Sequence, residues 1–230
     1  MPRPRSPLLS RTRIIDAALA LIDAEGLAAL STRRLALELG VSGPSLYNHF
    51  PTKEDLLEAV ADSVIAQVEL NAMTAAPWPQ ALGTWARSYH AALTAHPNLV
   101  PIAGHGPGRR PSALRMADTV YGALVMAGWP PREATRIGAL MRFFVIGSAL
   151  GSFAAGFVPD PEVYAADYPH LREAHLLAER RQSIDEGAFE LGLTALIAGL
   201  RLQFSETTQS ESSPKHINPT PEGSGGVSTV

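Results

Sequence analysis

The sequence contains no cysteine, which excludes disulfide bonds, thiolate metal sites and a cysteine nucleophile. This absence fits a reducing compartment, and we expect a cytoplasmic protein. The basic N-terminus lacks the apolar core of a signal peptide. Apolar and polar residues nowhere alternate with period two over a useful length, so we predict no β-sheet and an all-α fold.

The motifs of the common catalytic sites are also missing. The sequence has no G-x-S-x-G, no G-x-x-x-x-G-K and no H-E-x-x-H. His170 and His175 are five residues apart rather than four, which is the wrong spacing for two metal ligands on one helical face. We therefore predict no enzyme, no cofactor and no metal, and keep an all-α enzyme as a remote alternative.

Charge is scarce in one long stretch. Gly138–Val158 carries a single charged residue, Arg142, in 21 positions. A transmembrane helix needs about 20 apolar residues, so a membrane span is one interpretation. Five glycine and serine residues between positions 147 and 156 make the stretch less apolar than typical spans. We favour a helix that is buried on nearly all sides, and no membrane.

A strongly basic composition, as in proteins that coat nucleic acid, is absent too. The net charge is −3, but it is unevenly distributed. Residues 1–53 carry a net charge of +3 and the remaining residues −6. A basic N-terminal part on an otherwise acidic chain predicts that any contact with nucleic acid is made by that part.

The segment Ser31–Lys53 has the signals of two short helices joined by a tight turn. The hydroxyl of Ser31 can cap the first helix, and Gly40 suits the left-handed conformation that ends it. Ser42 can cap the second helix, whose first turn tolerates Pro44. A helix, a glycine turn and a second helix form the helix-turn-helix layout, whose second helix enters the major groove of DNA.

The residues on the outer side of this layout decide between DNA binding and an ordinary solvated helical hairpin. They offer hydroxyl, amide, imidazole and cationic groups, which suit phosphate oxygens and base edges. We therefore predict a contact with double-stranded DNA by Thr32, Arg33, Arg34, Ser42, Gly43, Pro44, Ser45, Tyr47, Asn48, His49 and Lys53.

The run from Thr32 to Leu57, with its L-Y-x-H-F block and the following x-x-K-x-x-L-L, resembles the DNA-binding domain of TetR-type (tetracycline-repressor-like) transcriptional regulators. The resemblance implies that Tyr47, His49 and Lys53 grip phosphates. It assigns base reading to Ser42, Gly43, Pro44, Ser45 and Asn48.

Apolar periodicity and breaks divide the chain into four parts. Residues 1–9 hold three prolines and two arginines, and we expect a flexible basic arm. Residues 10–70 form a three-helix DNA-binding domain, whose last helix opens with a capping box at Thr52 and runs to about Met73. Residues 77–204 form a larger helical domain for ligand binding and dimerisation. In residues 205–230, 16 of 26 residues are Ser, Thr, Pro or Gly, which predicts a disordered tail.

The middle helices combine aromatic and methionine residues with a few polar groups. Such walls are typical of small-molecule pockets, although ordinary core packing is the alternative. We predict an apolar or aromatic small-molecule effector, bound by Trp85, Tyr89, His90, His105, Met116, Tyr121, Met141 and Phe144. This part also resembles the C-terminal domain of tetracycline-repressor-like regulators. Trp85 replaces an amide that contacts the drug there, which argues against tetracycline–Mg²⁺ as the effector.

Small residues recur on the last two long helices. Glycine inside a helix costs up to about 1 kcal/mol relative to alanine, so several of them need a packing reason. We predict that two helices from each subunit form a four-helix bundle in a homodimer. The resemblance implies the same arrangement. The predicted interface residues are Gly147, Gly151, Gly192, Ala195 and Gly199.

These observations predict a DNA-binding transcriptional regulator, a homodimeric repressor that a small molecule releases from its operator. A dimer that binds DNA without a ligand, with a merely architectural role, is the alternative.

Overall fold

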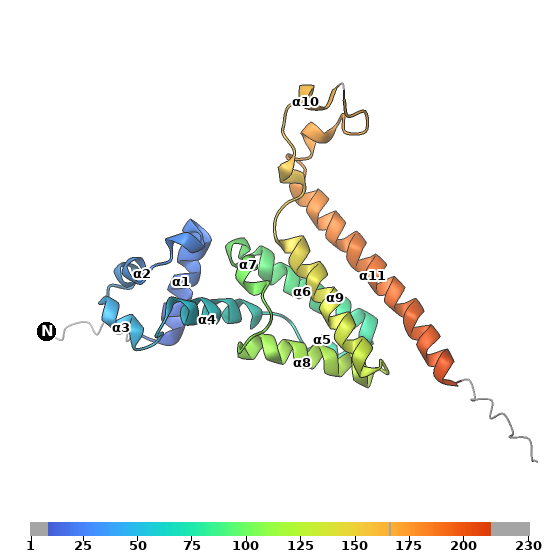
Figure 1. The fold of residues 1–230 in the computed structure, drawn as a ribbon, viewed down its shortest axis with the longest axis horizontal. Helices are drawn as coiled ribbons and strands as arrows, with labels where there is room; N and C mark the ends of the chain where they lie inside the picture. Colours follow the sequence, from blue (N-terminus) through green and yellow to red (C-terminus); the bar gives the residue numbers. More distant parts are fainter. Residues whose placement is uncertain (1–8, 166, 213–230) are drawn as a thin grey trace, which may run out of the picture.

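The computed structural model describes residues 9–165 and 167–212, and these residues contain helices and no strand. The predicted all-α fold class is confirmed. The chain forms a small helical head at the N-terminal end and a larger helical body (Figure 1). The predicted arm, apart from Leu9, and the predicted tail beyond Ser212 lie outside the described residues.

The head contains α1 (Arg11–Glu25), α2 (Thr32–Leu39) and α3 (Gly43–Tyr47). The side chain of Ser31 accepts a hydrogen bond from a backbone N–H group in the first turn of α2, as predicted, and Ser10 does the same for α1. Gly40 ends α2 with a φ of 67°, a conformation that favours glycine. The second cap differs from the prediction, because the Ser42 hydroxyl pairs with the Ser45 hydroxyl at 2.7 Å rather than with a backbone N–H.

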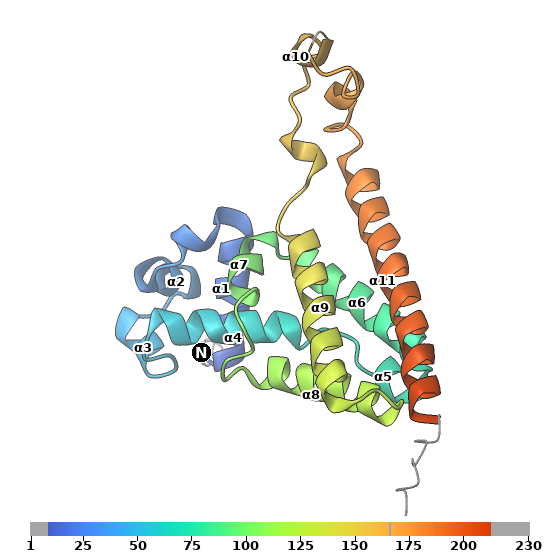
Figure 2. The same cartoon turned by 45° about the vertical axis from the view of Figure 1, so that its right-hand side comes forward.

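Helix α4 (Lys53–Ile65) runs from the head into the body, beside α8 (Figure 2). Its N-terminus has the predicted capping box, in which Thr52 and Asp55 exchange hydrogen bonds of 3.0 and 3.2 Å. The prediction that this helix reaches Met73 is wrong. Its last turn tightens after Ile65, and the chain continues through a turn into the short helix α5 (Ala72–Ala75). Val68 and Met73 are buried in this turn, so their apolar spacing mimicked a longer helix.

The body is built from α6 (Trp78–Thr94), α7 (Val100–Ala103), α8 (Pro111–Met126), α9 (Pro131–Ala149) and α11 (Arg181–Ser212). Helix α6 packs against α9 and α11, and α8 packs against α4 and α9. Both views show α9 and α11 running alongside each other (Figures 1 and 2). Helix α11 continues eight residues beyond Phe204, so residues 205–212 are helical rather than part of a disordered tail.

The apolar stretch Gly138–Val158 is not one buried helix. Helix α9 ends at Ala149, and the side chains of Leu150 and Phe153 are 61 % and 70 % exposed. The chain then projects from the body through the short helix α10 (Glu162–Ala165) before it enters α11 (Figure 1). Before α11, residues 171–180 form turns around a 3₁₀ segment, Ala174–Leu176. None of the helices in the described residues is long and apolar enough to cross a membrane.

Candidate functional site

Two of the three residues predicted to grip phosphates, Tyr47 and Lys53, lie in one depression of the head together with Thr32, whereas His49 does not line it. This shallow depression lies between the start of α2 and the start of α4. The Thr32 and Tyr47 hydroxyl oxygens are 3.4 Å apart, and Tyr47 is 54 % exposed. The structure therefore brings together three groups that can donate to phosphate oxygens.

The other predicted DNA contacts differ in how accessible they are. Arg33, Ser42, Pro44, Asn48 and Lys53 are exposed, whereas Gly43, Ser45 and His49 are half-buried. Arg34 forms ion pairs with Glu25 at 2.8 Å and with Glu38 at 3.1 Å. The charge of Arg34 is thus already paired inside the head. The spacing of four residues indicates the pair with Glu38, but nothing in the sequence indicates the pair with Glu25.

Arg11 supports this surface, although it was not among the predicted DNA contacts. Its guanidinium donates a hydrogen bond to the backbone carbonyl of His49, just after α3, and lies 4.1 Å from the ring centre of Phe50. A cation at this position stabilises the exposed carbonyl groups at a helix C-terminus. The contact spans 38 positions of the sequence, so no local pattern could predict it.

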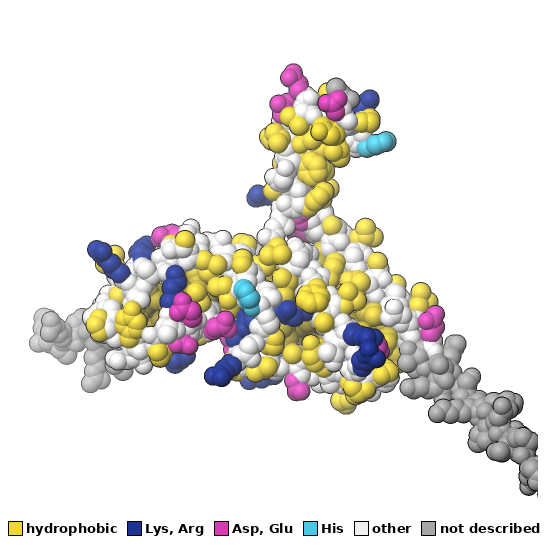
Figure 3. Space-filling view, viewed as in Figure 1, with side chains coloured by type: hydrophobic (Ala, Val, Ile, Leu, Met, Phe, Trp, Pro, Cys, Tyr) yellow, Lys and Arg dark blue, Asp and Glu magenta, His cyan; other side chains and the backbone are white. Residues whose placement is uncertain are grey.

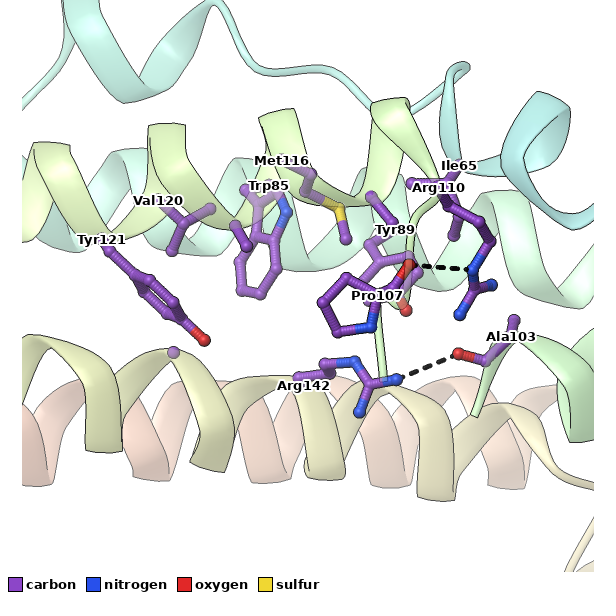
Figure 4. A pocket seen from close by; sticks show the side chains of 13 residues that line it. Ile65, Trp85, Tyr89, Ala103, Pro107, Arg110, Met116, Val120, Tyr121 and Arg142 are labelled. Carbon is purple, nitrogen blue, oxygen red and sulfur yellow. Dashed lines mark hydrogen bonds between the residues drawn. The ribbon is translucent and has the colours of Figure 1, made fainter. Parts of the chain in front are cut away.

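A pocket with a cavity volume of about 50 Å³ lies inside the body. Sites that bury a drug-sized ligand measure about 300–1,000 Å³, so an effector of that size would have to move the lining residues apart. Four of the predicted effector-binding residues line it, namely Trp85, Tyr89, Met116 and Tyr121 (Figure 4). The other lining residues are Ile65, Ala103, Pro107, Arg110, Ala113, Ala117, Val120, Gly138 and Arg142.

The other four predicted effector-binding residues do not line this pocket. His90 stacks on Phe189 of α11 with ring centres 3.9 Å apart, and burial lowers its pKa from the usual 6.5. Phe144 also stacks on Phe189, with ring centres 5.4 Å apart. Met141 is fully buried in the core, and the imidazole of His105 is exposed to solvent. The aromatic residues therefore divide between the pocket and the packing of α11.

Two arginines line the pocket and were not among the predicted site residues. Arg110 is 4 % exposed, and its guanidinium donates to the carbonyl groups of His105, Gly106 and Pro107. Arg142 donates to the carbonyls of Ala103 and Gly104, at 3.1 and 3.0 Å, where α7 ends. The isolated charge of Arg142 in an apolar stretch was the one signal in the sequence that could have indicated such a role.

A close approach between two helices shapes one wall of the pocket. A methyl group built on Gly138 of α9 would lie 1.9 Å from the ring of Tyr121 on α8. The side chain of Tyr121 therefore occupies the space that any larger residue at position 138 would take. This glycine allows the aromatic wall of the pocket to lie directly on α9.

Contacts between head and body converge on α4. The carboxylate of Glu58 pairs with Arg110 at 3.2 Å. One turn further along, the Asp62 carboxylate accepts the backbone N–H groups of Ser112 and Ala113 at 2.9 and 3.1 Å, at the start of α8. A separate contact joins Asp23 of α1 to His96 of the body at 2.8 Å. Arg110 thus belongs both to the pocket wall and to the connection with the head.

The predicted dimer residues lie on two different surfaces. A methyl group on Gly147, Gly151 or Gly199 would have no neighbour within 4 Å, and these glycines and Ala195 are exposed. Gly192 instead faces Phe144 of the same chain, whose ring would be 2.6 Å from such a methyl group. Large apolar side chains are exposed on α9 and α11, including Phe143 and Leu202, and Figure 3 shows hydrophobic groups over this face.

These features define a two-part DNA-binding regulator, with a helix-turn-helix head and a helical body that holds a small-molecule pocket. Comparison with known proteins gives the same class of protein. Residues 14–60 match the profile of bacterial regulatory proteins of the tetR family, and residues 72–204 match the tetracycline repressor-like C-terminal domain. The chain belongs to the TetR family of bacterial transcriptional regulators.

Individual relatives cover most of the chain. An HTH-type transcriptional regulator from Saccharopolyspora erythraea is 34 % identical, with 84 % of this chain and 85 % of the relative covered. The class E tetracycline repressor from Escherichia coli is 31 % identical over 86 % of this chain and 93 % of its own. The structure of ActR from Streptomyces coelicolor in complex with actinorhodin has a TM-score of 0.68 and 30 % identity, covering 85 % of this chain and 98 % of ActR.

Proposed function

We propose that the protein is a homodimeric repressor that leaves its operator when a small, largely apolar molecule binds in the body pocket. One observation carries this proposal. Arg110 lines the pocket and pairs with Glu58 on α4, the helix that connects the head to the body. A molecule that moves Arg110 therefore acts on the position of the head. That ActR was solved with actinorhodin bound supports a ligand for this body as well.

The proposed mechanism rests on the spacing between the two heads of a dimer. Their α3 helices must lie roughly 34–36 Å apart to enter successive major grooves. An effector that displaces α4 changes this spacing. Coupling of this kind is typically about 1–3 kcal/mol, which corresponds to roughly a 5–150-fold loss of affinity.

The switch can be tested with a duplex selected from a random DNA pool and a panel of aromatic compounds screened by thermal shift. A compound that binds should weaken operator affinity in fluorescence anisotropy, and the operator should weaken compound binding by the same factor. If the dissociation constant of the compound is identical with and without saturating operator, the pocket is not a switch. The ligand-independent DNA-binding dimer would then be the better description.

The DNA surface has its own test. We expect Lys53→Ala to weaken binding to all duplexes and to reduce the slope of log affinity against log salt by about one, because one phosphate contact is lost. Tyr47→Ala should weaken binding uniformly, whereas Asn48→Ala should change sequence preference. Gln67→Ala, at an exposed position after α4, is the control. Unchanged affinity in both Lys53→Ala and Tyr47→Ala would exclude this face of the head.

A further inference from the structure

The pocket is apolar along most of its wall but positively charged at one end. Two arginines line it, and no aspartate or glutamate is among its lining residues. Figure 4 shows the side chains of Arg110 and Arg142 reaching the same end, with Tyr121 at the opposite end. The acid that pairs with Arg110 is Glu58, which lies outside the pocket wall and is half-exposed.

Two buried donors in this pocket remain unpaired. The Nη1 group of Arg110 and the indole Nε1 of Trp85 have no hydrogen-bond partner among the described residues. Both residues are almost completely buried, at 4 % and 2 % exposure. Buried donors without acceptors are costly and rare in folded proteins, and more so on a charged group. A ligand that brings acceptors to both atoms would remove this cost.

Tyr89 lies near both arginines. Burial raises the pKa of Tyr89, and the nearby positive charges of Arg142 and Arg110 act in the opposite direction. Both guanidinium groups therefore act on the same point of the pocket. The carbonyl groups of residues 103–107 already occupy part of their hydrogen-bonding capacity, but carbonyl groups carry no net charge. Glu58 pairs with Arg110 from outside the pocket, and no acid among the described residues pairs with Arg142.

We propose that the effector is an aromatic carboxylate, whose anionic group binds Arg110 beside Arg142 and whose ring system carries an acceptor for the Trp85 indole. The apolar wall of Ile65, Met116 and Val120 would contact the rings. This inference rests on the proposed role of the pocket as the effector site. It adds the chemical class of the ligand and the residues that select it.

Three matched probes test the inference on the unmodified protein. They are 9-fluorenone-2-carboxylate, its neutral 2-carboxamide, and fluorene-2-carboxylate, which lacks the ring carbonyl. Isothermal titration calorimetry at pH 7.5 should show the fluorenone carboxylate binding at least about tenfold more tightly than the carboxamide, because a charge-assisted bond is lost in the amide. The fluorene compound should also bind more weakly than the fluorenone carboxylate. Equal affinity for carboxylate and carboxamide, or no binding of any probe, would overturn the inference.

Substitutions then assign the preference to residues. Arg110→Gln and Arg142→Gln should each reduce the carboxylate-to-carboxamide ratio, whereas Arg136→Gln, an exposed arginine on the same helix as Arg142, should not. Retention of the ratio in both pocket variants would overturn the assignment. The comparison on the unmodified protein stands even if Arg110→Gln fails to fold.

DNA release is measured separately. A carboxylate that binds with the expected preference and leaves operator affinity unchanged contradicts the proposed switch and supports the ligand class.

Discussion

Gly138 is the residue at which a single absent methyl group determines the shape of the pocket. The ring of Tyr121 fills the space where the side chain of any other residue would begin. We expect Gly138→Ala to lower the free energy of unfolding by about 1–3 kcal/mol, because overpacking displaces the Tyr121 ring. Urea denaturation monitored by circular dichroism measures this change.

The control for this substitution is Gly122→Ala on α8, where a methyl group meets no atom within 4 Å. It should leave stability unchanged or raise it by up to about 1 kcal/mol, since alanine favours a helix. Combining Gly138→Ala with Tyr121→Ala should cost less than the sum of the two single changes, because the clash disappears with the ring. Strict additivity would contradict the contact.

Half of the residues predicted to bind the effector line the pocket. Trp85 and Tyr89 share one face of α6 and both line the pocket. His90 was adjacent in sequence but faces Phe189, which lies 99 positions further along the chain. Which helix covers which face is decided by such distant contacts. Arg110 was missed for the same reason, because its role depends on the loop carbonyls and on Glu58.

At the scale of the helices, α8 depends on α4 for its N-terminal cap. Its own N-cap residue makes no side-chain hydrogen bond, and Asp62 of α4 accepts the N–H groups of Ser112 and Ala113 instead. We expect Asp62→Ala to destabilise the protein by about 0.5–2 kcal/mol, the range measured for lost caps. Asp62→Asn keeps one acceptor oxygen and should cost less.

Urea denaturation of these variants, beside Asp118→Ala at an exposed position of α8, measures the effect of the cap. A change in Asp62→Ala no larger than in Asp118→Ala would show that α8 is stable without the cap. Such a result would also remove one of the connections between head and body.

Helix ends could be predicted where a local signal marks them. Ser31, Gly40 and the Thr52 capping box each act within one turn of the chain, and each was predicted correctly. The ends of α4 and α9 were missed. No proline follows Ile65 directly, and Val68 and Met73 continue the apolar spacing because the body buries them. Tertiary contacts end these helices, and a single sequence does not contain that information.

At the scale of the whole molecule, substitutions at two glycines on α11 test the dimer interface and the stability of the subunit independently. Gly199 faces open space, so Gly199→Leu should leave the subunit folded but convert a dimer to a monomer, as measured by light scattering. Gly192 packs on Phe144 of the same chain, so Gly192→Ala should lower subunit stability by about 1–3 kcal/mol. A Gly199→Leu variant that still sizes as a dimer would place the interface elsewhere.

The contacts of α4 also bear on how this protein can be recombined with its relatives. The matched DNA-binding profile ends at residue 60, between Glu58 and Asp62, although both side chains serve the body. A chimera joined at that boundary would take Glu58 from the protein that supplies the head and Asp62 from the protein that supplies the body. A junction in the turn before Thr52 would instead transfer the whole of α4 together with the body that it caps. The unit that can be exchanged between such regulators is therefore smaller than the domain that sequence similarity outlines.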